Sequence, residues 1–283
     1  MARSDAIAKE ERALHEQFEA LPRRNLLAVL SIVAITLLIN FIDQNGLSTA
    51  LPTIADDLHA QNTISWAGTT SLLANATFQM LYGRLSDIFG RKTVFLAAMA
   101  LLSFADLLCG LSKNATMLYI SRGIAGIGGG GITNLSMIIL SDVVTLEQRG
   151  KYIGVTGSMI GTGSVIGPFL AAAFAEKSTW RGFFWLLAPL GVIVTALCAV
   201  YLPSKPPEVS FSESVRKIDW LGTLTSSVGI IFILIPVSGG GAYFEWSSPM
   251  VIAMLAIGAT SLVLFVVVQW KIAKLPMMPG ELQ

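Results

Sequence analysis

Long apolar stretches recur along this chain and are interrupted only by short polar segments. A bilayer core about 30 Å thick is crossed by a helix of about 20 apolar residues, and eight stretches reach that length. Of the residues, 53% are hydrophobic and 13% are charged, whereas soluble domains carry about 25% charged residues. We therefore predict an all-α polytopic membrane protein with eight transmembrane helices, at residues 26–49, 63–83, 93–112, 115–140, 152–174, 183–202, 219–238 and 249–270.

A polar stretch divides these spans into two groups. Residues 203–218 contain three prolines and several charges, and they form the one clear linker of the sequence. The expected organisation is a cytoplasmic N-terminal segment at 1–25, a six-span bundle at 26–202, the cytoplasmic linker at 203–218, two extra spans at 219–270 and a cytoplasmic tail at 271–283. The first apolar run is too long for the hydrophobic region of a signal peptide, so it is expected to act as its own insertion signal.

The distribution of cations predicts the orientation in the membrane. Cytoplasmic loops of membrane proteins are rich in Lys and Arg. With the N-terminus inside, the outer loops hold only Lys113, Lys177 and Arg181, Arg122 lies within a span, and the other 15 of the 19 cations fall on the cytoplasmic side. Both termini are therefore expected to be cytoplasmic.

Composition also argues against several classes of function. The net charge is +1, and nucleic acid is not an expected partner because its binding needs a basic surface. Cys109 and Cys198 lie inside apolar runs and are expected to be small buried side chains. His15 and His59 are isolated, so we predict no metal site. The loops contain no nucleophile–base set, so an enzyme is not expected.

The connection between the second and third spans concentrates charge and glycine. Its sequence, Gly83-x-Leu85-x-Asp87-x-x-Gly90-Arg91-Lys92, resembles the signature loop of the major facilitator superfamily. An ordinary positively charged cytoplasmic loop is the alternative. The glycines are expected to permit a tight turn, and the aspartate to accept hydrogen bonds from nearby cations. The resemblance implies a gating loop made by Gly83, Asp87, Gly90, Arg91 and Lys92. Charged residues at the inner end of span 4 are predicted either to cluster with this loop or to be solvated singly; they are Asp142, Glu147 and Arg149.

Two further stretches resemble motifs of the fourteen-span drug:proton antiporter branch of that superfamily. Asp43-Gln-Asn-Gly-Leu-Ser-Thr-Ala-Leu-Pro52 is similar to an Asp-x-Thr…Ala-Leu-Pro motif, with Asn45 in place of Thr. Span 5 is similar to the antiporter motif that ends in Gly-Pro, although Ala171 and Ala172 replace a usual pair of glycines. Small residues let helices approach closely, which would seal the cavity of an antiporter on one side. The resemblance implies that this packing motif is made by Gly157, Gly161, Gly163, Gly167 and Pro168.

Ionisable residues within spans are costly and usually functional. Arg122-Gly-Ile-Ala-Gly126 resembles the superfamily's Arg-x-x-Gln-Gly motif, with Ala125 in place of Gln. At 1.5 Å per residue, Arg122 lies roughly 9 Å from the outer edge of its span and Asp43 about 26 Å from the inner edge. Both therefore lie in the outer third of the membrane. We predict that Asp43, Arg122 or both line a substrate and proton pathway, with Asp43 as the protonation site. A purely structural ion pair is the alternative, and the role of Asp106 stays open.

Uncharged polar side chains on the same helices are weaker candidates for this pathway. Asn40 and Gln44 flank the aspartate of span 1, and Asn40 shares its helical face. Asn75 and Gln79 are four residues apart in span 2 and so lie on one face, and Asn134 is in span 4. Each is expected either to contact substrate or to form a hydrogen bond between helices.

The resemblance covers residues 23–279 and implies a function. Transporters of this kind move small molecules by alternating access between two related halves. The implied activity is proton-coupled export of drugs, toxins or metabolites, with the proton gradient as energy source and no cofactor. The implied partners are the lipid bilayer and a small-molecule substrate, at the plasma membrane or the vacuolar membrane. Transport of amino acids or other metabolites across either membrane is an alternative.

The resemblance also implies that part of such a transporter is absent. Residues 218–246 look like the two extra spans of the fourteen-span branch, and Leu275-Pro-Met-Met-Pro279 resembles the loop before its ninth span. Six spans comparable to the first six do not follow, so we expect a C-terminally truncated member. Self-association is expected only if the truncation is genuine. The remaining alternative is a non-transporting membrane protein that acts as an interaction or regulatory subunit.

Overall fold

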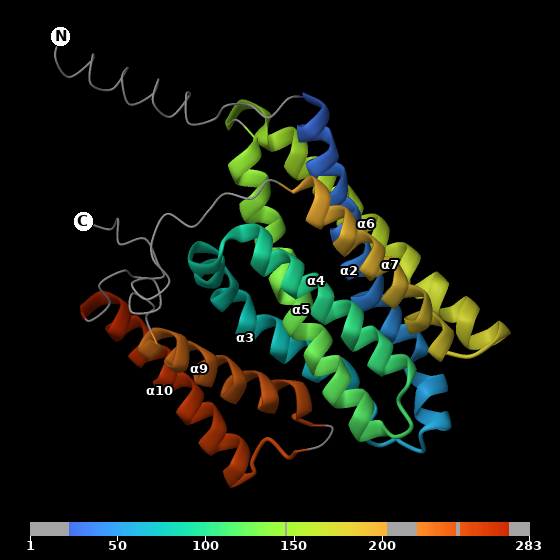
Figure 1. Ribbon diagram of the computed structural model, residues 1–283. Helices are drawn as coiled ribbons and strands as arrows, with labels where there is room; N and C mark the ends of the chain where they lie inside the picture. Colours follow the sequence, from blue (N-terminus) through green and yellow to red (C-terminus); the bar gives the residue numbers. More distant parts are fainter. Residues whose placement is uncertain (1–22, 145, 203–219, 242–243, 272–283) are drawn as a thin grey trace.

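The structure is an assembly of long α-helices (Figure 1). The computed structural model describes residues 23–144, 146–202, 220–241 and 244–271. The predicted linker at 203–218 lies outside these ranges, as do nearly all of the predicted terminal segments 1–25 and 271–283. The helices are α2 (Arg23–Asp57), α3 (Trp66–Phe89), α4 (Arg91–Gly110), α5 (Ala115–Val143), α6 (Leu146–Lys177), α7 (Arg181–Tyr201), α9 (Trp220–Gly239) and α10 (Pro249–Lys271).

Each predicted apolar stretch coincides with one of these helices, so the expected all-helical membrane fold is observed. Six helices in the described ranges are long and apolar enough to cross a membrane, namely α2, α4, α5, α6, α7 and α10. The apolar part of α9, Leu224–Gly239, is shorter. α3 is a continuous helix, but polar residues such as Thr69, Thr70 and Asn75 interrupt its apolar sequence. It is not among the six helices.

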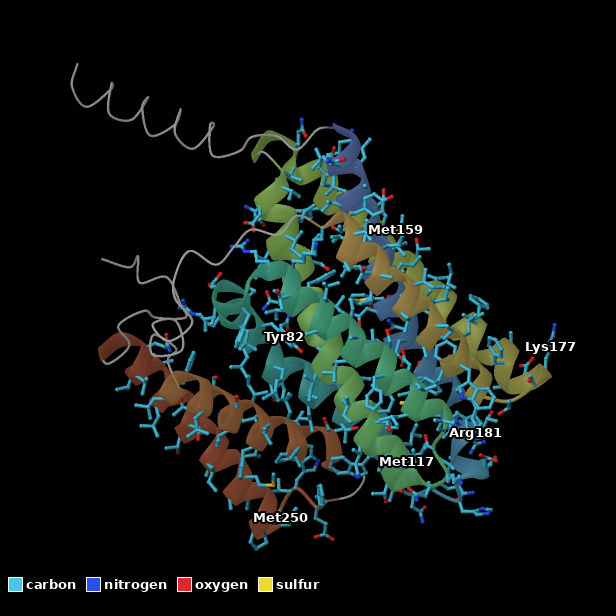
Figure 2. All side chains as sticks on the ribbon, viewed as in Figure 1. Tyr82, Met117, Met159, Lys177, Arg181 and Met250 are labelled. Atoms are coloured by element: carbon cyan, nitrogen blue, oxygen red, sulfur yellow. The ribbon has the colours of Figure 1, made fainter. Side chains whose placement is uncertain are left out.

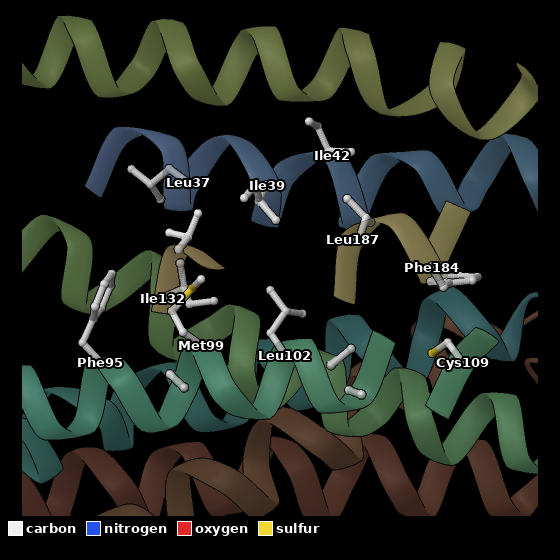
Figure 3. Packing of buried hydrophobic residues seen from close by; sticks show 14 of the residues in the cluster. Leu37, Ile39, Ile42, Phe95, Met99, Leu102, Cys109, Ile132, Phe184 and Leu187 are labelled. Carbon is white, nitrogen blue, oxygen red and sulfur yellow. The ribbon is translucent and has the colours of Figure 1, made fainter. Parts of the chain in front are cut away.

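Helices distant in sequence pair to form the bundle. α2 packs along α6 and also contacts α7, whereas α5 lies between α3 and α4. α4 packs in turn on α7, and the α9–α10 pair is joined to the rest through contacts between α9 and α3. Figure 1 shows the α9–α10 pair on the opposite side of the bundle from α6 and α7. The main core is built where α2, α4, α5 and α7 meet, as Figure 3 shows for Leu37, Met99, Ile132 and Leu187.

Glycines in α5 explain why α3 lies so close to it. A Cβ on Gly126 would lie 2.1 Å from the carbonyl oxygen of Ser71, and one on Gly130 would lie 2.7 Å from that of Asn75. Only glycine therefore allows the two backbones to approach this closely. A Cβ on Gly123, one turn earlier, would meet nothing within 4 Å.

The charged stretch between α3 and α4 is more helical than its sequence predicts. α3 continues to Phe89 and α4 begins at Arg91, so Gly90 is the whole connection between them. Gly90 has φ +85°, in the region that favours glycine. Gly83 lies inside α3 with open space around it. The expectation of glycines turning the chain at both ends of this stretch thus holds for Gly90 and is wrong for Gly83, because the helix runs on for six further residues.

Candidate functional site

Three buried charged side chains meet where α2, α4 and α5 converge. Arg122 of α5 donates from Nη1 to Oδ1 of Asp43 on α2 at 2.6 Å. The same Nη1 lies 4.0 Å from Oδ1 of Asp106 on α4. The three side chains are 1 to 2% exposed. Asp43 and Arg122, for which the sequence analysis expected a similar depth, therefore form an ion pair, and Asp106 lies beside it. We call these three residues the charged triad.

Two neighbouring helices complete the surroundings of the guanidinium. Nη2 of Arg122 donates to Oγ of Ser71 on α3 at 3.5 Å, and the ring of Phe184 on α7 lies with its centroid 5.9 Å from Cζ. Nε of Arg122 has no hydrogen-bond partner. A cation in an apolar site is stabilised by carboxylates and by an aromatic face. Five helices thus contribute to a single charged centre.

A cluster of amide side chains lies between α2, α3 and α5, close to the charged triad along these helices. Nδ2 of Asn40 donates to the carbonyl of Gly129 at 3.4 Å and to Oγ1 of Thr133 at 3.1 Å. Nε2 of Gln44 donates to Oδ1 of Asn40 at 3.3 Å. A Cβ at Gly129 would meet Asn40 at 2.8 Å, Gln44 at 3.2 Å and Asn75 at 3.6 Å. Three of the predicted pathway residues, Asn40, Gln44 and Asn75, are therefore brought together around Gly129, with Thr133 as a member that the sequence analysis missed.

The other two predicted amides form a different contact. Nδ2 of Asn134 donates to the backbone carbonyl of Gln79. This bond joins α5 to α3, which is the interhelical alternative given for such residues. Asn45 stands where the antiporter motif has Thr. Its Nδ2 donates to Oγ of Ser164 on α6 at 3.3 Å, so its side chain contacts a different helix.

Charged side chains of the signature stretch contact the C-terminal end of α5. Arg91 forms an ion pair with Asp142 and lies 3.9 Å from Asp87. The predicted cluster with span 4 is therefore present in part, although the side chain of Glu147 lies outside the described residues. Arg149 donates to Oγ of Ser141 at 2.8 Å. Lys92 is half-buried near the same turn.

The glycine motif of α6 divides into two groups. A Cβ at Gly163 or Gly167 would lie 2.7 or 2.6 Å from the carbonyl oxygens of Leu38 and Ile42 on α2. Gly157 and Gly161 are exposed, and a Cβ on either would meet nothing within 4 Å. α6 continues through Pro168, which is half-buried. In the described part of the chain, the motif therefore packs α6 on α2 through Gly163 and Gly167.

A second charged contact holds the opposite end of the bundle. Arg181 donates to Oδ2 of Asp57 at 2.8 Å and to the carbonyl of Ser112 at 3.0 Å. Its Cζ lies 4.3 Å from the ring centroid of Trp180, and Nε1 of Trp180 donates to Asp57 at 3.1 Å. Figure 2 shows Arg181 at the same end of the bundle as Met117 and Lys177. From the sequence, Arg181 was expected only to be one of the three cations of the outer loops.

A bundle of long apolar helices with a buried charged centre is typical of membrane transport proteins. Residues 33–279 match the Major Facilitator Superfamily, and the chain belongs to this family, a family of transporters and not of enzymes. It is accordingly a multi-pass integral membrane protein. The structure is similar to that of the POT family transporter PepTSo, with a TM-score of 0.61 and 15% sequence identity over 87% of this chain and 52% of that one.

Curated relatives place the chain near fungal exporters. It is 50% identical to Citrate exporter 1 of Yarrowia lipolytica over 96% of this chain and 40% of that protein. It is 34% identical to Efflux pump dotC of Dothistroma septosporum over 91% of this chain and 45% of that protein. The chain thus spans less than half the length of these relatives. The relation to fungal efflux pumps agrees with the resemblance found in the sequence.

Proposed function

We propose that the protein transports small molecules across a membrane by proton-coupled export with alternating access. The observation that carries the proposal is the charged triad, because ionisable groups buried inside a membrane bundle are costly and mark ion and substrate pathways. A carboxyl group in such a buried charged site can also bind a proton and release it when the site becomes hydrated. The membership of a transporter family and the fungal efflux pumps among its relatives support this function.

The proposal assigns roles to the residues around the triad. Asp43 and Arg122 line the proton and substrate pathway, and the amide cluster of Asn40, Gln44 and Asn75 offers hydrogen bonds to substrate. Gln79 and Asn134 border the same interface. Gating is assigned to the signature residues Gly83, Asp87, Gly90, Arg91 and Lys92, and helix packing to Gly157, Gly161, Gly163, Gly167 and Pro168.

We further propose that all eight helices span the bilayer, with both termini cytoplasmic. α3 and α9 belong to this set because α3 is enclosed by α5 and α9, and α9 packs along α10. The six-helix bundle of residues 26–202, the linker at 203–218 and the extra pair at 219–270 then form successive parts of the protein. Plasma membrane and vacuolar membrane are both compatible with this arrangement.

Replacement of Asp43 by Asn tests the proposed function. We expect proton-driven transport in reconstituted vesicles to be lost, because the carboxyl that pairs with Arg122 is removed without a change in side-chain shape. The measurement is acidification-driven substrate movement and the accompanying proton flux. Asp56→Asn is the matched control, since Asp56 lies on the same helix but is exposed and bonds Gln61. Undiminished proton coupling in the Asp43→Asn variant would contradict the proposal.

Export of an organic acid is a second candidate, favoured by the 50% identity to a citrate exporter. A comparison of labelled citrate with apolar toxins in the same vesicles separates the two substrate classes. Citrate flux that saturates, with no toxin flux, would favour the organic acid. Saturable flux of several toxins that inhibit one another would favour drug or toxin export.

A further inference from the structure

We propose that Asp106 holds the proton of the charged triad, while Asp43 stays ionised as the partner of Arg122. This assignment rests on the proposed function and names the carboxyl group that carries its proton. It differs from the expectation drawn from the sequence, which placed the proton on Asp43.

The charged triad holds one more acidic group than basic groups. The described residues around the triad supply one guanidinium and two carboxyl groups, and all three side chains are 1 to 2% exposed. An uncompensated carboxylate in an apolar interior is very costly, and two carboxyl groups that share one site do not both ionise. One bound proton makes the triad neutral.

Geometry decides which carboxyl group is protonated. Asp43 accepts a charge-assisted hydrogen bond from Arg122 at 2.6 Å, which stabilises its ionised form. Oδ1 of Asp106 lies 4.0 Å from the same nitrogen and has no hydrogen-bond partner. Coulomb attraction falls with distance, so the charge belongs on Asp43 and the proton on Asp106.

The neighbourhood of Asp106 favours the same distribution. Asp43 and Asp106 both face Nη1 of Arg122, at 2.6 and 4.0 Å, and two carboxyl groups that share one site form a hydrogen bond with each other only when one of them is protonated. Protonated Asp106 then donates to Asp43. The charged groups that face Asp106 are Asp43 from α2 and Arg122 from α5, with the thiol of Cys109 on its own helix.

Among the residues that the structure describes, α3 and α7 close the site from the other sides and contribute no further charge to it. Ser71 from α3 and Phe184 from α7 both contact Arg122, and neither titrates in the working range of the protein. When the site opens to water, Asp106 can release its proton to solvent. Arg122 is then shared between two carboxylates.

Infrared spectroscopy of the full chain, purified in a detergent without ester or carboxyl groups, tests the assignment without any transport assay. A protonated carboxyl group has a carbonyl-stretch band that a carboxylate lacks. We expect one such band at neutral pH, and we expect Asp106→Glu to displace it because the carbonyl then belongs to a glutamic acid. Asp43→Glu should leave the band in place, and Asp56→Glu is the control for an exposed site.

Two spectral results would overturn the assignment. One is a band displaced by Asp43→Glu and not by Asp106→Glu. The other is the absence of a protonated carboxyl band in the unmodified chain. If the glutamate variants do not fold, a hydrophobic carbodiimide, which reacts with protonated carboxyl groups, is applied to the unmodified chain. Peptide mass spectrometry should find the adduct on Asp106, and an adduct on Asp43, or on neither aspartate, would overturn the assignment.

The two proposals fail separately. If the vesicles show no proton-driven flux but the infrared band belongs to Asp106, the proposed transport activity is rejected and the assigned protonation state stands. Vesicles with flux but with the band assigned to Asp43 would keep the transport activity and reject Asp106 as the proton carrier.

Discussion

At the scale of single residues, Arg122 bears one positive charge and two carboxyl groups lie within 4.0 Å of it. Removing one member of a buried ion pair leaves the other uncompensated, which costs more than the pair contributes when it is intact. The effect of any substitution in the triad therefore depends on which of the other two members remain.

Arg122→Gln should lower the free energy of unfolding by about 3–5 kcal/mol, because it leaves a buried carboxylate without its cation. The measurement is unfolding of the purified protein by SDS in mixed micelles. The double variant Asp43→Asn with Arg122→Gln should be less destabilised than Arg122→Gln alone. Equal stabilities of Arg122→Gln and the unmodified chain would show that the ion pair contributes nothing.

The similar depth of Asp43 and Arg122 could be predicted from the sequence because depth along a helix follows from residue number. The sequence could not predict the place of Asp106, since the direction in which a side chain leaves its helix relative to other helices depends on packing. The same limit applied to Asn134 and Asn75. Both carry amides at interior positions, but only the structure shows that Asn134 bonds the backbone of α3 whereas Asn75 lies beside Gly129.

At the scale of helices, close packing depends on where glycines fall on each surface. α5 contacts α3 through Gly126 and Gly130, and α6 contacts α2 through Gly163 and Gly167. The glycine runs could be seen in the sequence. Which of these glycines lie against a neighbouring helix and which have open space beside them could not. Helix limits were predicted within a few residues, except where polar helical turns such as Arg84–Phe89 extend α3 beyond its apolar part.

Gly126→Ala should destabilise the protein by about 1–3 kcal/mol, since its Cβ would force apart the backbones of α5 and α3. Gly123→Ala is the matched control on the same helix. It meets nothing within 4 Å and should stabilise the helix by roughly 0.5–1 kcal/mol. SDS unfolding of the two variants measures the difference. Equal effects of the two substitutions would contradict the close approach of α3.

At the scale of the whole molecule, charged contacts at the two ends of the bundle mark opposite membrane surfaces in the proposed topology. Arg91 and Asp142 lie at one end, and Asp57 and Arg181 lie at the other. The positive-inside distribution predicts that the first pair lies on the cytoplasmic side. The all-helical membrane fold could be predicted at this scale because the lengths of apolar runs and the charge bias are properties of the sequence alone.

Cysteine labelling in oriented cells or vesicles tests this topology. Ser178→Cys, in the connection between α6 and α7, should react with a membrane-impermeant maleimide from outside. Thr93→Cys, at the start of α4, should react only after the inner side is exposed. Both positions are exposed, and the native Cys109 and Cys198 are fully buried and should remain unlabelled. Reversed labelling of the two variants would reject the orientation.

The long separation between Asp43 and Arg122 has a consequence for biosynthesis. The two residues are 79 positions apart, so at a synthesis rate of about 5–20 residues per second the aspartate is made roughly 4–16 s before its partner. α2 must therefore remain in the translocon or the bilayer for that time with its carboxyl group unpaired. Insertion of an Asp costs about 2.5–3.5 kcal/mol at the centre of a membrane helix, and this value is an upper limit for Asp43 in the outer third of its span. The long apolar run that precedes Asp43 in α2 supplies the hydrophobic free energy that offsets this cost until α5 arrives.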